Sequence, residues 1–190
     1  MLICCLTSVA TGTESPSPDT LLTRIADGDR EALGTLYEEF HKAIYGYAFS
    51  VVKNEADAED VLHDCFVSIA KHAASYRRGT NAKAWMFTIA KNLAIQKWRD
   101  RQKSDMPDPA VWELLPDDAD DHTDDRLTVE ACMKYLSDEE RQIIVLHVVS
   151  GFRHREIAAL LNLPLSTVLS KYNRSLKKLQ RILSEKEREP

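Results

Sequence analysis

The stretch STVLSKYNRSLKKLQRIL, residues 166–183, decides how the C-terminal third of the chain folds. Its apolar side chains recur at the spacing of one helical face, at Val168, Tyr172, Leu176 and Leu179. Its cations recur on another face, at Lys171, Arg174, Lys178 and Arg181, with Lys177 beside them. The pattern predicts an amphipathic helix with a basic stripe. Such a stripe is either a DNA-binding surface or the solvated face of a bundle helix.

A shorter helix is predicted directly before this one. The sequence REIAALL, residues 155–161, has helical spacing, and Asn162-Leu163-Pro164 follows it. Asn tolerates the left-handed conformation that ends a helix, and Pro cannot continue one. A short helix, a tight turn and a basic helix are together typical of a helix-turn-helix, whose second helix enters the major groove of DNA. The pattern therefore favours DNA binding.

The charge of the chain is unevenly distributed. Its 190 residues allow one or two small domains, and the net charge of −5 argues against a nucleic-acid partner. Residues 105–125, however, contain nine acidic and no basic residues, whereas residues 126–190 contain 12 basic and eight acidic ones. A short acidic segment therefore hides a basic C-terminal domain.

The rest of the chain also reads as helical. Helical patterns are predicted over residues 19–26, 30–53, 55–73 and 82–103, the last with Trp85, Ile89, Leu93 and Trp98 facing inward. Nearer the C-terminus, a helix is predicted over residues 127–135, and Ser137 with Glu140 forms the capping-box pattern that opens the next one. No alternating pattern is long enough for a sheet, so we predict an all-α protein.

We predict two small helical domains joined by a flexible linker. The boundaries are a disordered extension over residues 1–18, a first domain over 19–104, an acidic linker over 105–125 and a second domain over 126–190. The linker contains three prolines, and its charge stretches it. We therefore expect domains that fold independently and are loosely tethered in the free chain. An uncleavable linker would instead indicate a compact form with hidden DNA-binding faces.

Several function classes find no support in the sequence. The four cysteines have no paired ligand spacing, so no metal site or other cofactor is expected, and Cys65 and Cys132 read as reduced core residues. The histidines are scattered, with no nucleophile at a suggestive spacing, and no Gly-rich phosphate loop occurs, so no catalytic residue or small-molecule substrate is expected. No apolar run is long enough to span a membrane. The first basic residue is Arg24, which argues against a secretory signal and favours the cytoplasm.

Three segments in this order resemble the extracytoplasmic-function sigma factors, the small two-domain members of the sigma-70 family. They are DAEDVLHDCFVSIAKH (residues 57–72), YRRGTNAKAWMFTIAKNLAIQKWRDR (76–101) and LSDEERQIIVLHVVSGFRHREIAALLNLPLSTVLSKYNRSLKKL (136–179). The resemblance covers roughly residues 19–183. It implies a subunit that binds core RNA polymerase, directs it to promoters and promotes strand opening. The implied partners are the polymerase β′ clamp and β flap and promoter DNA, with an anti-sigma factor as a further candidate.

The resemblance assigns roles in the first domain. The helix over residues 57–72 resembles the one that docks on the polymerase clamp, and the implied contacts are Asp60, His63, Asp64 and Phe66. His63 stands where Gln is commoner. The segment over residues 76–101 resembles the part that melts and reads the minus-ten element. Open bases need cations and apolar or aromatic surfaces, and the candidates are Tyr76, Arg77, Arg78, Asn81, Lys83, Phe87, Lys91, Lys97, Arg99 and Arg101. We expect Phe87 to lie off the apolar face.

The second domain resembles the part that binds the minus-thirty-five element. Side chains near the start of the reading helix are expected to reach base edges, namely Ser166, Thr167, Ser170, Lys171 and Arg174. Those further along are expected to hold phosphates, namely Lys177, Lys178 and Arg181. Arg153 and Arg155 are candidate backbone clamps. Leu169, Asn173 and the Arg153-His154-Arg155 run depart from the family pattern, so an atypical promoter is expected.

Two other functions remain open on the residues alone. One is a helix-turn-helix regulator that is not a polymerase subunit, and the other is an adaptor that binds a protein and no DNA. A regulator needs neither a clamp-docking helix nor a base-capturing loop. An adaptor does not need the basic stripe.

Overall fold

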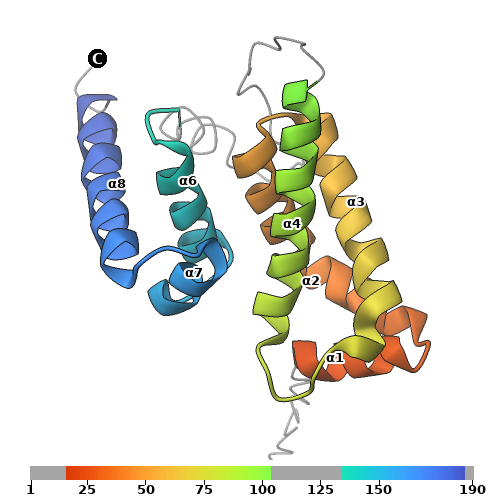
Figure 1. The fold of residues 1–190 in the computed structure, drawn as a ribbon. Coiled ribbons are helices and arrows are strands. Elements are labelled where there is room, and N and C mark those ends of the chain that lie inside the picture. Colours follow the sequence, from red (N-terminus) through yellow and green to blue (C-terminus); the bar gives the residue numbers. More distant parts are fainter. Residues whose placement is uncertain (1–15, 104–133, 187–190) are drawn as a thin grey trace, which may run out of the picture.

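The computed structural model describes residues 16–103 and 134–186, and every regular element in these ranges is helical (Figure 1). The first domain comprises α1 (Pro18–Ala26), α2 (Arg30–Val52), α3 (Glu55–His72), the short 3₁₀-helix η1 (Ala73–Ser75) and α4 (Ala82–Lys103). The second comprises α6 (Asp138–Ile144), the π-helix η2 (Val145–Val149), α7 (His154–Leu161) and α8 (Leu165–Lys186). The predicted linker and the predicted helix over residues 127–135 lie almost wholly outside the described residues. No helix in the described ranges is both long and apolar enough to cross a membrane.

Helix boundaries in the first domain follow capping residues. The Asp29 side chain accepts hydrogen bonds from the backbone N–H groups of Glu31 and Ala32 at the start of α2. Lys53 ends α2 in the left-handed conformation, with φ of 58°. The core that forms between these helices contains fully buried Leu, Ile and Met side chains, together with Cys65. Burial raises the pKa of the Cys65 thiol to about 12, as expected for an unreactive core cysteine.

The buried face of α4 differs from the predicted one. We expected Trp85, Ile89, Leu93 and Trp98 to face inward, yet the first three are only half-buried and Trp98 is 44% exposed. The buried stripe lies one residue further along, at Ala82, Met86, Ala90 and Ala94, with Phe87 beside it. Alanines on this stripe carry little side-chain bulk, which lets α4 approach α2 and α3 closely. The prediction failed because it weighted large aromatic residues over small ones.

The second domain begins and turns as predicted. Ser137 and Glu140 form a complete capping box at the start of α6. The helix then widens into η2, where the Ser150 N–H bonds to the carbonyl of Val145 five residues earlier, and Gly151 leaves it with φ of 64°. Asn162 adopts the left-handed conformation between α7 and α8, with φ of 55°. These features complete the predicted helix-turn-helix.

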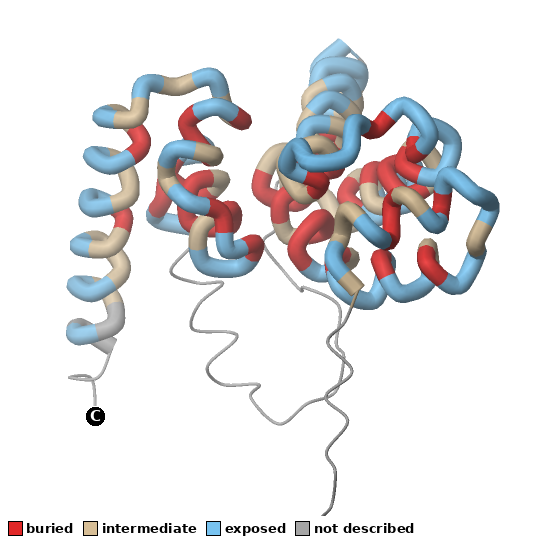
Figure 2. Tube along the Cα trace, turned by 90° about the horizontal axis from the view of Figure 1, so that it is seen from below, coloured by how far each residue is buried: buried red, intermediate tan, exposed pale blue. Residues whose placement is uncertain are grey.

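The two domains pack against each other. Helices α2 and α4 face α6, η2 and α7, and buried residues of both domains belong to one hydrophobic cluster. Phe87 is completely buried where they meet, with its ring 6.0 Å from that of Tyr47 and 4.9 Å from that of Phe152. Figure 2 shows buried segments on both sides of this junction. The structure therefore differs from our expectation of loosely tethered domains, because the apolar faces of α2 and α4 are covered by the second domain.

We expect Phe87→Ala to lower the free energy of unfolding by about 3–5 kcal/mol, because it deletes a buried ring and leaves a cavity. Urea denaturation followed by circular dichroism measures the change. Thr88→Ala, at the next and exposed position of α4, is the control and should change stability by less than about 0.5 kcal/mol. An unchanged midpoint for Phe87→Ala would mean that this ring is exposed in solution.

Candidate polymerase and nucleic-acid interfaces

The exposed face of α3 carries three of the four predicted polymerase contacts. Asp60, His63 and Asp64 are exposed. Phe66 is instead 7% exposed, and its ring packs 4.9 Å from that of Tyr37 on α2. Tyr37 is 39% exposed and stacks on His41. The aromatic ring available beside this face is therefore Tyr37, which the apolar pattern of α2 had placed among the core residues.

Ion pairs join the start of α3 to the last turns of α4. The ammonium of Lys97 lies 2.6 Å from Asp60 and 3.6 Å from Asp57, and the guanidinium of Arg101 lies 2.7 Å from Asp57. The hydrogen bond from Asp60 is the largest cause that raises the pKa of Lys97. A predicted polymerase contact and a predicted DNA contact thus neutralise each other in this structure.

The loop between η1 and α4 is fixed to α1. The hydroxyl of Tyr76 lies 2.5 Å from the Asp19 carboxylate and 2.9 Å from the Thr80 carbonyl oxygen. Tyr76 is buried, and burial is the main cause that raises its pKa, followed by the bond to Asp19. Its ring is therefore not open to an extruded base, contrary to our prediction. Tyr76 holds the loop in place, while Arg77 and Arg78 point into solvent.

Two hollows adjoin the predicted minus-ten residues. One lies between the start of α1 and the loop, lined by Pro18, Asp19, Gly79, Thr80, Asn81, Ala82 and Lys83. The other follows the C-terminal half of α4, lined by Lys91, Asn92, Ile95, Gln96, Arg99, Asp100 and Lys103. The second hollow adds Asn92, Gln96 and Lys103 to the residues that we had singled out. The sequence search selected cations and rings, and so it passed over the amides.

Phe87 is the clearest error among the predicted minus-ten residues. We expected its ring to contact bases because it lies off the main apolar face of α4. In the structure a second hydrophobic surface, from the other domain, covers that flank, so Phe87 is buried. A periodicity calculated along one helix cannot register a partner that lies about 65 residues further along the chain.

The reading helix α8 presents an open polar face. Ser166, Ser170, Arg174 and Lys177 are exposed, while Val168 and Ser175 on the opposite side are fully buried. Thr167 is half-buried, and Arg181 is exposed nearer the C-terminus. At the start of α7, Arg153 and Arg155 are exposed. The structure thus brings serine hydroxyls and cations together on one side of α8.

Two lysines of the basic stripe are bonded within the domain. Lys171 lies 2.7 Å from Glu139, and Lys178 lies 2.7 Å from Glu140, both on α6. Glu140 is only 2% exposed and also accepts the backbone N–H of Ser137. Burial acts to raise its pKa, but the bonds from Lys178 and Ser137 outweigh it and lower the pKa. Lys178 is therefore a structural residue here, whereas we had predicted a phosphate contact.

A histidine pair supports α8 from below. His147 and His154 stack with ring centroids 4.3 Å apart, and Tyr172 meets both rings edge-on. Burial, and then the neighbouring His147, lower the pKa of His154. We had described the histidines as scattered, but the turn between η2 and α7 brings these two together. Within the described ranges, no three His, Cys, Asp or Glu side chains converge as a metal site would require.

Two segments of the chain match descriptions of known protein regions. Sigma-70 region 2 matches residues 36–104, and Sigma-70 region 4 matches residues 126–179, so together they cover more than half of the chain. The chain belongs to the sigma-70 family. This sigma factor is 25% identical over 173 residues to the ECF RNA polymerase sigma factor SigK of Mycolicibacterium vanbaalenii, spanning 87% of this chain and 88% of that one. It is 26% identical to SigK of Mycobacterium bovis, spanning 87% and 92%.

Solved sigma-factor structures share the fold of this sigma factor. RpoE of Bartonella quintana, in complex with the anti-sigma factor NepR, matches with a TM-score of 0.67 at 25% identity, over 80% of this chain and 96% of that chain. CnrH, in complex with the cytosolic domain of CnrY, matches with a TM-score of 0.63 at 24% identity, over 88% and 97%. The predicted family and the all-α fold are thereby confirmed.

We expect Lys178→Met to lower the free energy of unfolding of the sigma factor by about 1–3 kcal/mol at neutral pH, because it leaves the buried Glu140 carboxylate without its ammonium partner. Lys177→Met, one residue away on the exposed face, is the control and should have little effect. Urea denaturation of both variants measures the difference.

The effect of Lys178→Met should depend on pH with a defined sign. Folding lowers the pKa of Glu140, so its stabilisation is present above the ordinary value of 4.5 and is lost as the pH falls through the lowered value. The gap between wild type and Lys178→Met should therefore narrow below pH 4.5. A gap of constant size on both sides of that pH would contradict the assignment.

Proposed function

We propose that this sigma factor reads the minus-thirty-five element with the exposed face of α8 and holds the opened minus-ten strand along the loop over residues 76–81 and α4. The observation that carries the proposal is the polar face of α8, where Ser166, Ser170, Arg174 and Lys177 lie opposite the buried side of the same helix. A helix supported in this way is the device that a helix-turn-helix inserts into the major groove.

In the duplex complex, the first turns of α8 meet base edges. Ser166, Ser170 and Arg174 supply hydroxyls and a guanidinium at this end, and Arg contacts guanine through two hydrogen bonds. Lys171 can join them by exchanging Glu139 for DNA, since a surface ion pair is weak. Lys177 and Arg181 hold phosphates further along, and Arg153 and Arg155 hold the backbone from the start of α7.

On the opened strand, the two hollows serve different parts of the nucleotide chain. The hollow between α1 and the loop is bordered by Asp19, Thr80 and Asn81, whose polar groups suit the edge of an extruded base. The hollow along α4 contains Lys91, Arg99 and Lys103, whose charges suit phosphates. Arg77 and Arg78 extend the positive surface at the tip of the loop.

Core polymerase docks on the exposed face of α3. Asp60, His63 and Asp64 form this face together with the exposed ring of Tyr37, in the place that we had assigned to Phe66. The helix-turn-helix domain contacts the polymerase flap. An anti-sigma factor is a further partner by analogy, because RpoE of Bartonella quintana and CnrH were each solved bound to another protein.

We expect Arg174→Ala to weaken binding of the minus-thirty-five duplex by about 1–3 kcal/mol and to relax the preference at one or two base pairs. Lys177→Ala should weaken all sequences alike and make the dependence of log K on log salt shallower by about one unit. Selection from a randomised duplex library at two salt concentrations measures both effects. Retained affinity and selectivity in both variants would leave the stripe a merely solvated face.

Asp64→Ala is expected to weaken the association of the sigma factor with core polymerase by about 1 kcal/mol or more, because it removes an exposed carboxylate from the proposed docking face. Glu59→Ala, on the same helix and also exposed, is the matched control. Pull-down of core polymerase at graded concentrations, with circular dichroism of each variant, gives the comparison. Equal losses in the two variants would argue for a general charge effect and against this docking face.

A further inference from the structure

Four of the predicted minus-ten residues are in contact with the second domain. They are Asn81, Lys83, Phe87 and Lys91, and they line one side of the loop end and the first half of α4. Each one contacts α7 or the residue that leads into it. The surface proposed for the opened strand is thus partly occupied by this chain itself.

Phe152 is the apolar centre of the contact. Its ring meets that of Phe87 edge-on at 4.9 Å, and the Lys83 ammonium lies 4.6 Å from the centre of the same ring. Burial is the main cause that lowers the pKa of Lys83, although Glu156 and Glu39 act to raise it. A cation in this position is removed from the surface that would attract phosphates.

Both ends of α7 are bonded to the first domain. At the N-terminal end, the Asn81 amide donates to Glu156 at 2.6 Å, and the other oxygen of Glu156 accepts the backbone N–H of Arg153. At the C-terminal end, the Lys91 ammonium donates to the Leu160 carbonyl oxygen at 2.6 Å. The C-terminus of a helix carries partial negative charge, so a cation is favoured there. Helix α7 therefore offers Lys91 a substitute for phosphate oxygens.

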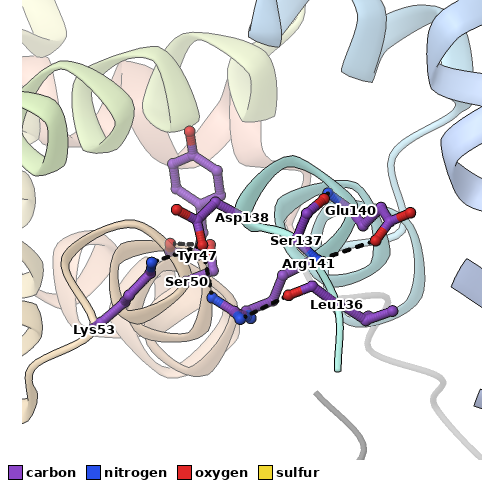
Figure 3. Close-up of polar contacts among 8 residues, drawn as sticks. All are labelled: Tyr47, Ser50, Lys53, Leu136, Ser137, Asp138, Glu140 and Arg141. Carbon is purple, nitrogen blue, oxygen red and sulfur yellow. Dashed lines mark hydrogen bonds and ion pairs between the residues drawn. The ribbon is translucent and has the colours of Figure 1, made fainter. Parts of the chain in front are cut away.

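A second contact holds the domains together away from the DNA surfaces. Asp138 of α6 lies 2.7 Å from Lys53 at the end of α2 and 3.2 Å from the buried Arg141 of its own helix (Figure 3). Next to it, a Cβ atom added to Gly46 of α2 would lie 3.7 Å from a methyl carbon of Val145 in η2. The position therefore suits a covalent link between the domains that touches no proposed DNA contact.

The other two functional faces remain open in the same structure. Helix α8 packs on α6 and α7 and lies on the side of the second domain away from α4 (Figure 1). Helix α3 packs on α2 and α4, and its carboxylates at Asp60 and Asp64 are exposed. The closed arrangement therefore covers one DNA-reading surface and leaves the other surface and the polymerase face accessible.

We infer that α7 and Phe152 form an internal competitor for the minus-ten strand, so that the free sigma factor binds the minus-thirty-five duplex but not the opened strand until polymerase separates the two domains. This inference rests on the proposed role of α4. Core polymerase can dock on α3 while the domains are closed, and opening follows as the second domain moves to its own site. The apparent affinity for the strand falls in proportion to the fraction of open molecules.

The test locks the closed form with a disulfide. Gly46→Cys with Val145→Cys is placed in a chain whose Cys4, Cys5 and Cys132 are replaced by Ser, leaving the buried Cys65. The Cβ atoms in disulfides lie about 3.8 Å apart, which the Gly46 and Val145 positions approach. Gly46→Cys with Val148→Cys is the control pair, because Val148 is 63% exposed. Binding of a fluorescent minus-ten single strand and of a minus-thirty-five duplex is measured before and after reduction, with and without core polymerase.

We expect the first pair to couple rapidly in the monomer and the control pair slowly. The oxidised protein should bind the single strand at least about tenfold more weakly than the reduced protein, should bind the duplex equally well, and should support runoff transcription only after reduction. Equal strand binding in both redox forms would overturn the inference, as would coupling no faster than in the control pair. If the reduced protein fails to bind the strand even with core polymerase, the proposed role of α4 is wrong and the inference fails with it.

Discussion

The edge-on contact between Phe87 and Phe152 makes one structure of two small helical units. Each domain alone has little interior, and the apolar flank of α4 would face water if the second domain moved away. The open form thus needs a partner that covers this flank or its equivalent on the other domain. Polymerase association and domain separation are coupled by that requirement, because exposure of Phe87 and Phe152 is unfavourable unless new contacts compensate.

Charged side chains in this protein fall into exchangeable and fixed groups. Lys97 with Asp60 and Lys171 with Glu139 are surface pairs, whose partners can be replaced by phosphate or protein at little cost. Lys178 with Glu140 is different, because removal of either partner leaves a charge inside the domain. Glu140 also caps α6, so the same carboxylate fixes the start of that helix and the position of α8 against it. The basic stripe therefore contains one member that orients the reading helix and others that can meet DNA.

What the sequence could predict was local, and what it missed depended on distant partners. The capping box at Ser137, the left-handed turn at Asn162 and the buried Cys65 follow from short patterns, and each was predicted. The buried stripe of α4 was misassigned by one residue because alanines contribute little to a hydrophobic pattern, although they permit close helix packing. Phe87, Tyr76 and Lys178 were assigned to DNA because each carries suitable chemistry. Their actual partners, Phe152, Asp19 and Glu140, lie far away along the chain, and no periodicity reports them.

The π-helix η2 sets the direction in which the reading helix points. Its wide turn holds one residue more than an α-helix would over the same hydrogen bonds, just before the chain turns at Gly151 into α7. Each residue of an α-helix corresponds to about 100° of rotation, so loss of a single residue here would swing α7 and α8 around the axis of α6 by roughly that angle. The length of this short segment thus works as a discrete angular setting between the two promoter elements. Single-residue insertions and deletions at η2 would change the geometry of the promoter that the protein accepts in steps, whereas substitutions on α8 would change only its base sequence.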